Sequence, residues 1–230
     1  MKHSTRYELT PWDVFVLTLI LFGLAIYTST QQYLLLNQEV VTVDENLTFS
    51  NAQNYYAFIS QFLQLLLAAA YLKWRRFDFS RWRIQPSWQA IFHGIGLFIL
   101  LSLAMDLYYV LIYGVAEPVY PVPFTQVLGE VRFSTVLYAL LNGFYEEIFF
   151  LGICLAVKPQ YLKWAVLYSL IIRVSFHTYQ GMETALGLGI WLGLVIYLLY
   201  ARSKDKNLLP FWVAHAIADV FGLSIASYFT

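Results

Sequence analysis

Hydrophobic residues occur along this chain in long stretches that short polar connections separate. Each stretch is near the ~20 residues that a helix needs to cross the hydrocarbon core of a bilayer. The stretches are continuously apolar and do not alternate, which disfavours strands. The pattern predicts an all-α, polytopic transmembrane helical bundle of seven helices, with eight as the upper count. The predicted spans are Trp12–Ser29, Tyr55–Leu72, Trp88–Tyr113, Phe133–Val157, Leu162–Thr178, Thr184–Ala201 and Leu208–Phe229.

Composition points to the same class of protein. Hydrophobic residues make up 60% of the 230 positions and charged residues 12%, against about 45–50% and about 25% in soluble domains. The formal net charge is zero, which argues against nucleic acid as a partner, because phosphate binding needs a basic surplus. We therefore expect residues 1–230 to form a single integral membrane domain whose surroundings are the lipid bilayer.

The single cysteine, Cys154, excludes an intrachain disulfide, a CxxC redox pair and a cysteine-based zinc finger. Its apolar neighbours predict a buried, inert thiol.

Basic residues gather on one side of the predicted spans. Lys2 and Arg6 precede the first span, and most other Lys and Arg residues follow the second, fourth and sixth spans. The opposite connections carry Glu39, Asp44, Glu45, Glu117, Glu130 and Glu183. Because cytoplasmic loops are enriched in Lys and Arg, the N-terminus is predicted to be cytoplasmic. Tryptophans near the predicted inner boundary agree with this orientation.

Ionisable side chains inside the spans are few, and each is expensive in a bilayer. They are His93, Asp106, Glu146, Glu147, Arg173, His177, His215 and Asp219. Six of the eight fall on the fourth, fifth and seventh spans, which predicts one polar cavity inside the bundle. We interpret His93 and Asp106, on the third span, as local polar contacts or cavity lining.

Glu146 and Glu147 stand side by side in an otherwise apolar helix. Adjacent helical residues point about 100° apart, so one carboxylate can face the cavity while the other orients or supports it. A carboxylate in such a place can take a proton from water. The alternative is a structural polar pair that contacts Arg or His on neighbouring helices.

The two other polar stretches each place a pair of residues on one helix face, four positions apart. Arg173 precedes His177, and a buried guanidinium needs an anionic partner, for which the glutamate pair is the candidate. His215 precedes Asp219, which either fixes the tautomer of His215 or, when protonated, donates a hydrogen bond. An Asp–His pair that only holds helices together is the structural alternative.

Taken in order, these three stretches resemble the CAAX-protease and bacteriocin-processing (CPBP, Abi) family of intramembrane endopeptidases. That family is marked by a Glu-Glu pair, a helix that ends in His, and a last helix with His-x-x-x-Asn/Asp. The resemblance covers about residues 134–222. It implies hydrolysis of a peptide bond in a membrane-associated peptide or a lipidated protein, and bacterial members process peptides and bacteriocins. By this resemblance we expect a bacterial cell membrane as the location.

Carried over residue by residue, the resemblance implies that Glu146 activates water with the help of His177. It implies that Glu147 supports the site and that His215 and Asp219 stabilise the oxyanion. A metal is left open: Zn²⁺, if bound, would take its ligands from Glu146, His177, His215 and Asp219. A metal-free mechanism uses the same residues, and the positive charge of Arg173 favours it.

Two positions depart from the family pattern. The family usually has an arginine four residues after the second glutamate, where this chain has Leu151, and a phenylalanine four residues before the first histidine, where it has Arg173. Our hypothesis is that the exchange is compensatory and that Arg173 supplies the charge partner of Glu147.

Two other functions fit the same residues. Intramembrane Glu, Asp, His and Arg could form the proton relay of a proton-coupled transporter, and a non-catalytic scaffold could keep a vestigial site without the arginine at position 151. A single site also requires matching depths. At ~1.5 Å per residue, His215 is predicted to lie on the order of 10 Å shallower than His177, unless tilt or shifted helix ends remove the offset.

Overall fold

The computed structural model describes residues 8–36, 50–114 and 131–228, and within these ranges it is an all-α bundle without a β-sheet, as predicted. Seven helical passes follow one another. They are α1 (Pro11–Leu36), α2 (Asn51–Trp74), α3 (Trp88–Tyr113), α5 (Phe133–Glu147) with a π-helical continuation (Ile148–Ile153), α6 (Leu162–His177), α7 (Met182–Leu186) joined through a π-helix (Gly187–Leu192) to α8 (Gly193–Arg202), and α9 (Leu209–Phe221).

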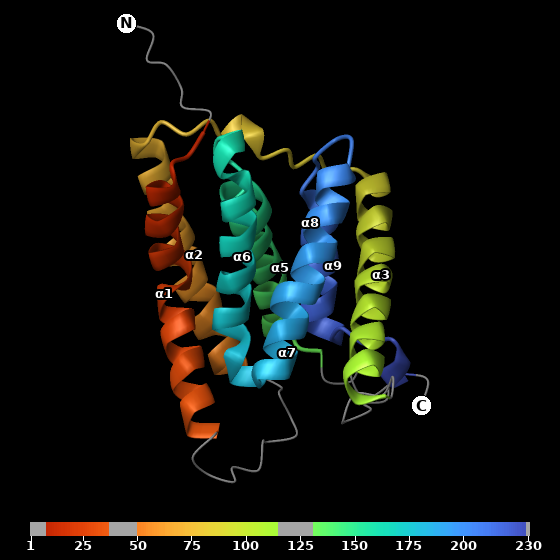
Figure 1. The fold of residues 1–230 in the computed structure, drawn as a ribbon. Helices are drawn as coiled ribbons and strands as arrows, with labels where there is room; N and C mark the ends of the chain where they lie inside the picture. The colour runs from red at the N-terminus through yellow and green to blue at the C-terminus, as the bar shows by residue number, and fades with distance from the viewer. Residues whose placement is uncertain (1–7, 37–49, 115–130, 229–230) are drawn as a thin grey trace, which may run out of the picture.

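The passes run alternately up and down, and α5 occupies the middle of the bundle (Figure 1). α5 packs against α2 on one side and α9 on the other, while α9 also packs against α3. α6 packs against α1 and against the π-helix between α7 and α8. The helices α5 and α9, which carry two of the three polar stretches, are therefore direct neighbours in the interior.

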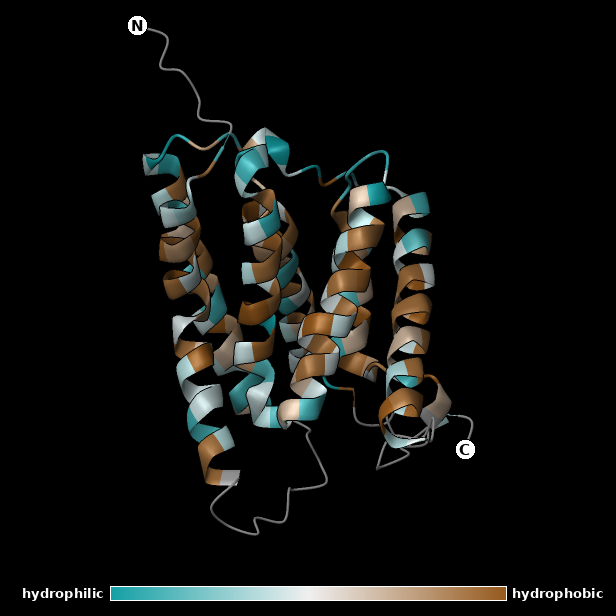
Figure 2. Cartoon of the chain, in the orientation of Figure 1, coloured by the Kyte–Doolittle hydropathy of each residue, from teal (hydrophilic) through white to brown (hydrophobic). Residues whose placement is uncertain are grey.

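In the part of the chain that the structure describes, five helices are long and apolar enough to cross a membrane, and α6 and α9 are shorter. Apolar side chains cover most of the helical surface, and hydrophilic residues gather at the upper end of the bundle (Figure 2). Many large hydrophobic side chains are exposed on the outer faces of α1, α2 and α3. The chain is thus an integral membrane protein, whose exposed apolar surface faces lipid.

The connections α2–α3, α5–α6 and α8–α9 lie at the same end of the bundle, at the top of Figure 1. They carry the basic residues Arg75, Arg76, Arg81, Arg83, Lys158, Lys204 and Lys206, and Arg202 ends α8 beside them. Lys2, Arg6 and the acidic residues Glu39, Asp44, Glu45, Glu117 and Glu130 lie outside the described residues. The cytoplasmic orientation of the basic end stays a prediction, as does the bacterial membrane.

An ion pair between the buried Asp13 and the half-buried Arg75 joins the start of α1 to the end of α2. Asp13 is fully buried, and Arg75 Nε donates to its Oδ1 at 2.6 Å. Tyr71 donates to the same oxygen at 2.8 Å, and the backbone N–H of Thr10 donates to Oδ2. The hydrogen bond to Asp13 raises the pKa of Arg75 above its ordinary value. Every oxygen of this buried carboxylate is therefore paired, which is the condition for burying a charge.

The seventh predicted span is shorter than expected. It was predicted to continue to Phe229, but α9 ends at Phe221 because Gly222 adopts a positive φ of 78° and turns the chain away. The segment that follows returns to α3, where Asp106 accepts hydrogen bonds from Ser224 Oγ at 2.6 Å and from two backbone N–H groups at 3.1 Å. Asp106 is thus a local polar contact, one of the two roles predicted for it.

His93 and Cys154 are the two remaining polar positions of the sequence analysis. His93 is exposed on α3, and Cys154 is buried, as expected for an inert thiol.

Candidate active site

The two adjacent glutamates lie at a change of helix geometry. Glu146 and Glu147 are the last residues of α5, and both are buried, at 5% and 2% relative exposure. The chain continues as a π-helix, in which the Cys154 N–H donates to the Phe149 carbonyl at 2.8 Å. π-helical turns inside α-helices are rare and are often found at functional sites.

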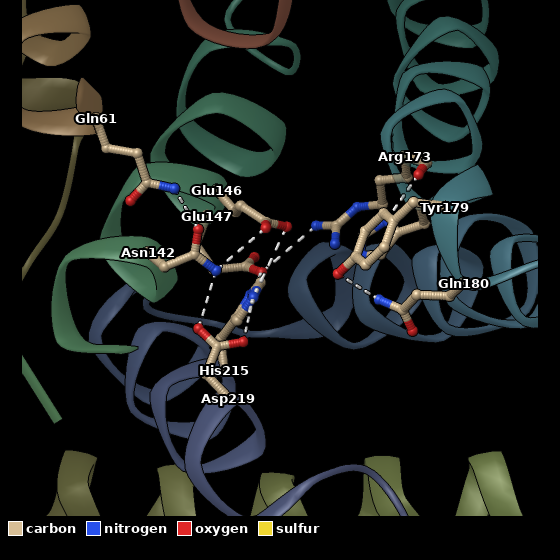
Figure 3. Close-up of polar contacts among 10 residues, drawn as sticks. Gln61, Asn142, Glu146, Glu147, Arg173, Tyr179, Gln180, His215 and Asp219 are labelled. Carbon is tan, nitrogen blue, oxygen red and sulfur yellow. Dashed lines mark hydrogen bonds and ion pairs between the residues drawn. The ribbon is translucent and has the colours of Figure 1, made fainter. Parts of the chain in front are cut away.

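Glu147 connects three helices through one carboxylate oxygen. Its Oε1 lies 2.8 Å from His215 Nδ1 on α9 and 3.4 Å from Arg173 Nη2 on α6. The guanidinium of Arg173 also lies 3.8 Å from the centre of the Phe150 ring. The dashed lines of Figure 3 converge at this point. The ion pair that the sequence hypothesis assigned to Arg173 is thus present in the fold.

A second group of atoms surrounds the other nitrogen of His215. Nε2 lies 3.7 Å from Glu146 Oε2 and 3.6 Å from Asp219 Oδ1. Both distances exceed a direct hydrogen bond. Glu146 Oε2 is buried, and no group of the described residues hydrogen-bonds to it; the same holds for Glu147 Oε2. Unpaired buried carboxylate oxygens are rare and call for an explanation such as a bound water or a catalytic role.

Two residues of this network did not come out of the sequence analysis. Asn142 Nδ2 donates to Glu146 Oε1 at 3.3 Å and to Asp219 Oδ2 at 2.9 Å, and Gln61 Nε2 on α2 donates to Asn142 Oδ1 at 2.6 Å (Figure 3). The signal for Asn142 was its position four residues before Glu146, on the same face of α5. Gln61 gave no comparable signal, because α2 has no ionisable residue at this depth.

His177 lies at the end of α6, one turn beyond Arg173. Its Nδ1 is 2.8 Å from the Arg173 carbonyl oxygen. Among the hydrogen bonds and ion pairs of the described residues, none joins His177 to Glu146. The fold therefore brings Glu146, Glu147, Arg173, His215 and Asp219 into one contact network, and it connects His177 to that network through the backbone of Arg173.

The close approach of α5 and α9 makes these contacts attainable. A Cβ atom on Gly143 would lie 3.0 Å from the Ala216 nitrogen and 3.0 Å from the Trp212 carbonyl oxygen. The indole of Trp212 donates to the Leu140 carbonyl at 2.7 Å and fixes the register of the two helices. A glycine is needed at this crossing because both nearest atoms belong to the backbone.

The side chains of the described residues are not arranged as a metal-binding cluster. Within the described ranges, no group of three His, Cys, Asp or Glu side chains is arranged to hold a metal ion. The guanidinium of Arg173 adds a fixed positive charge beside the carboxylates. We therefore derive no step through Zn²⁺.

Comparison with known proteins finds a family model that resembles part of the chain. Residues 129–221 match the family model described as type II CAAX prenyl endopeptidase Rce1-like. No curated protein and no solved structure matches the chain. The matched segment contains all six ionisable residues of the predicted site together with Asn142, and it leaves out Gln61. Residues 129–221 of this integral membrane protein are thus similar to the CAAX protease family that its three polar stretches resemble.

Proposed function

We propose that this chain is an intramembrane endopeptidase that hydrolyses a peptide bond in a prenylated or otherwise lipidated protein, or in a membrane-associated peptide. The observation that carries the proposal is the buried, unpaired Oε2 of Glu146, 3.7 Å from His215 Nε2, inside the segment that matches the prenyl endopeptidase model. A water oxygen beside these two atoms can lie within hydrogen-bond distance of both.

In the proposed reaction Glu146 acts as the general base. It takes a proton from this water while the water oxygen bonds to the carbonyl carbon of the substrate, and the carbonyl oxygen becomes an oxyanion. Glu146 then returns the proton to the nitrogen of the leaving amine as the C–N bond breaks. Atoms and charges balance without a covalent enzyme intermediate.

His215 stabilises the oxyanion in this proposal. A carboxylate oxygen only accepts hydrogen bonds, so the contact with Glu147 places a proton on His215 Nδ1. A neutral ring would then have a lone pair on Nε2, so donation to the oxyanion requires the doubly protonated imidazolium. The surrounding carboxylates of Glu146, Glu147 and Asp219 favour that cation, and Arg173 offsets part of their charge.

Asp219 and His177 have supporting roles in the proposed reaction. Asp219 donates to the oxyanion when protonated, or holds His215 when ionised, and Asn142 fixes one of its oxygens. The carbonyl oxygen of Arg173 can only accept a hydrogen bond, so its contact with His177 places a proton on Nδ1. In the neutral ring, Nε2 is then able to receive a proton. We propose that His177 assists Glu146 through this nitrogen and that the reaction needs no metal.

The test is cleavage of a prenylated CAAX-type peptide by the purified protein in proteoliposomes, with a fluorophore and a quencher on either side of the cleaved bond. Glu146→Gln removes the base, and we expect cleavage to fall at least about 100-fold. Glu183→Gln is the matched control, because Glu183 is an exposed carboxylate at the start of α7, outside the site. Equal activity of the wild type and Glu146→Gln would contradict the proposal.

The same vesicles separate the alternatives. Proton-coupled uptake without cleavage would favour the transporter, and neither activity would favour a non-catalytic scaffold. Parallel assays with an unprenylated hydrophobic peptide and with a bacteriocin-type precursor decide between CAAX-type and peptide-processing substrates.

A further inference from the structure

We propose that Asn142, oriented by Gln61, is a positioning residue that selects which oxygen of Glu146 acts as the base; this inference rests on the proposed function. Asn142 touches Glu146 and Asp219 through the same amide nitrogen. Each carboxylate is thereby held by one oxygen, Oε1 of Glu146 and Oδ2 of Asp219.

The two oxygens that Asn142 does not hold are those nearest to His215 Nε2. They are Glu146 Oε2, at 3.7 Å, and Asp219 Oδ1, at 3.6 Å. A carboxylate that rotated freely about its last bond would present either oxygen. The amide donor removes this freedom and directs one oxygen of each acid toward the imidazole. The amide of Asn142 also keeps the carboxylates of Glu146 and Asp219 apart, since it lies between them.

Gln61 fixes the orientation of the Asn142 amide. Its Nε2 donates to Asn142 Oδ1 at 2.6 Å, so the amide nitrogen of Asn142 must point toward the acids. With the amide reversed, its carbonyl oxygen would face two carboxylates that only accept. Gln61 lies on α2, which contributes no ionisable residue to the site. A helix outside the family match thus acts on the reacting oxygen through one intermediate side chain.

Burial makes this arrangement effective. Asn142 is 6% exposed, and Glu146 is 5% exposed. In a low-dielectric interior a hydrogen bond to a carboxylate is stronger than in water. Misplacement of a catalytic group by about 1 Å lowers rates by on the order of 100-fold. We therefore expect Asn142→Ala to lower kcat about 10- to 100-fold with KM changed less than about twofold.

The control is Asn54→Ala. Asn54 is also a buried asparagine between α2 and α5, where its Nδ2 donates to Ser134 and Thr135 at 3.2 Å, away from the acids. Its loss weakens the same helix pair without touching the network, so kcat should stay within about twofold. Gln61→Glu is the second variant, since its carboxylate would face the Asn142 carbonyl and favour the reversed amide. It should reproduce the kcat loss with little change in KM.

A readout independent of cleavage separates this inference from the proposed function. Carboxylate stretching bands in the infrared report hydrogen bonds to the oxygens, so the difference spectrum of Asn142→Ala against wild type should change in that region. The spectrum of Asn54→Ala should not. If the wild type cleaves nothing, the proposed function fails while the spectra still decide the positioning role. Unchanged carboxylate bands, or a loss of activity confined to KM, would overturn it.

Discussion

The guanidinium of Arg173 lies against the carboxylate of Glu147, with 3.4 Å between Nη2 and Oε1. Both side chains are buried, and they join α6 to α5 at the level of His215. Removing one partner of a buried ion pair leaves an uncompensated charge and typically costs about 3–5 kcal/mol. The pair is therefore expected to matter both for folding and for the position of His215.

Arg173→Gln should lower the free energy of unfolding by about 3–5 kcal/mol and reduce cleavage strongly, because Glu147 loses its charge partner. Arg75→Gln is the control, since it breaks the ion pair of a half-buried arginine with the buried Asp13 at the basic end of the bundle. It should lower stability comparably but keep kcat. Thermal unfolding in detergent together with kinetics below the transition measures both quantities. Wild-type cleavage activity of Arg173→Gln would contradict the role of Arg173 as a charge partner that Glu147 needs for catalysis.

The hypothesis that Arg173 compensates for the missing arginine at position 151 can be tested separately. Leu151 is buried one residue after Phe150 in the π-helix. If Arg173 replaces the arginine that the family pattern expects at position 151, then Arg173→Phe should be inactive, and adding Leu151→Arg should restore part of the cleavage. A double variant as inactive as the single one would contradict a compensatory exchange, though not the ion pair itself.

Asp219→Asn should keep cleavage within about tenfold of wild type, because its carbonyl oxygen can still accept from Asn142 and its amide N–H can donate to the oxyanion in place of a protonated Asp219. Asp219→Leu should lose about 10²–10³ in kcat, the usual effect of removing an oxyanion donor. Comparing kcat for the two variants separates the effect of a hydrogen-bond donor at position 219 from the effect of its negative charge. Equal loss in both would show that the negative charge of Asp219 is what the site needs.

Gly143→Ala should separate α5 from α9. The new Cβ would meet backbone atoms at 3.0 Å, which cannot rotate away, so we expect a loss of about 1–3 kcal/mol and a fall in kcat as Glu147 moves from His215. Gly96→Ala on α3 is the control, because nothing lies within 4 Å of a Cβ there. It should leave stability unchanged or raise it, since alanine favours helix. Similar behaviour of the two variants in denaturation would argue against a tight crossing.

The predicted orientation can be tested with single thiols. The native Cys154 is buried and should not react with a membrane-impermeant reagent. Glu183→Cys, at the start of α7, should be labelled on intact cells, whereas Asp205→Cys, in the α8–α9 connection, should be labelled only after the membrane is opened. Both positions are exposed. The reverse pattern would place the N-terminus outside.

Apolar patterning was enough to predict all seven passes, because lipid requires long continuous helices and charges interrupt them. It could not predict the π-helix after Glu147, which depends on packing around Phe149 and Phe150 rather than on composition. The end of α9 was missed because Gly222 looked like another small residue in an apolar run.

Within the site, spacing of four residues correctly paired Arg173 with His177 and His215 with Asp219 on shared faces. The depth offset expected between His177 and His215 stays a prediction; α6 reaches the network through Arg173, one turn before its terminal histidine. Gln61 and Asn142 were missed because neutral amides carry no charge that demands explanation in a bilayer. The Asp13–Arg75 pair escaped notice for a different reason: both residues lie at span ends, where charges are ordinary.

Four of the tryptophans, Trp12, Trp74, Trp88 and Trp164, are 67–78% exposed, and all belong to helix ends or starts at the basic end of the bundle. The fluorescence emission of an indole depends on its surroundings, so these four tryptophans report the depth at which the bundle sits in the bilayer. Lipids brominated near the headgroup should quench a larger share of the fluorescence than lipids brominated near the chain terminus. A change in bilayer thickness would then be visible in the native protein without any added label.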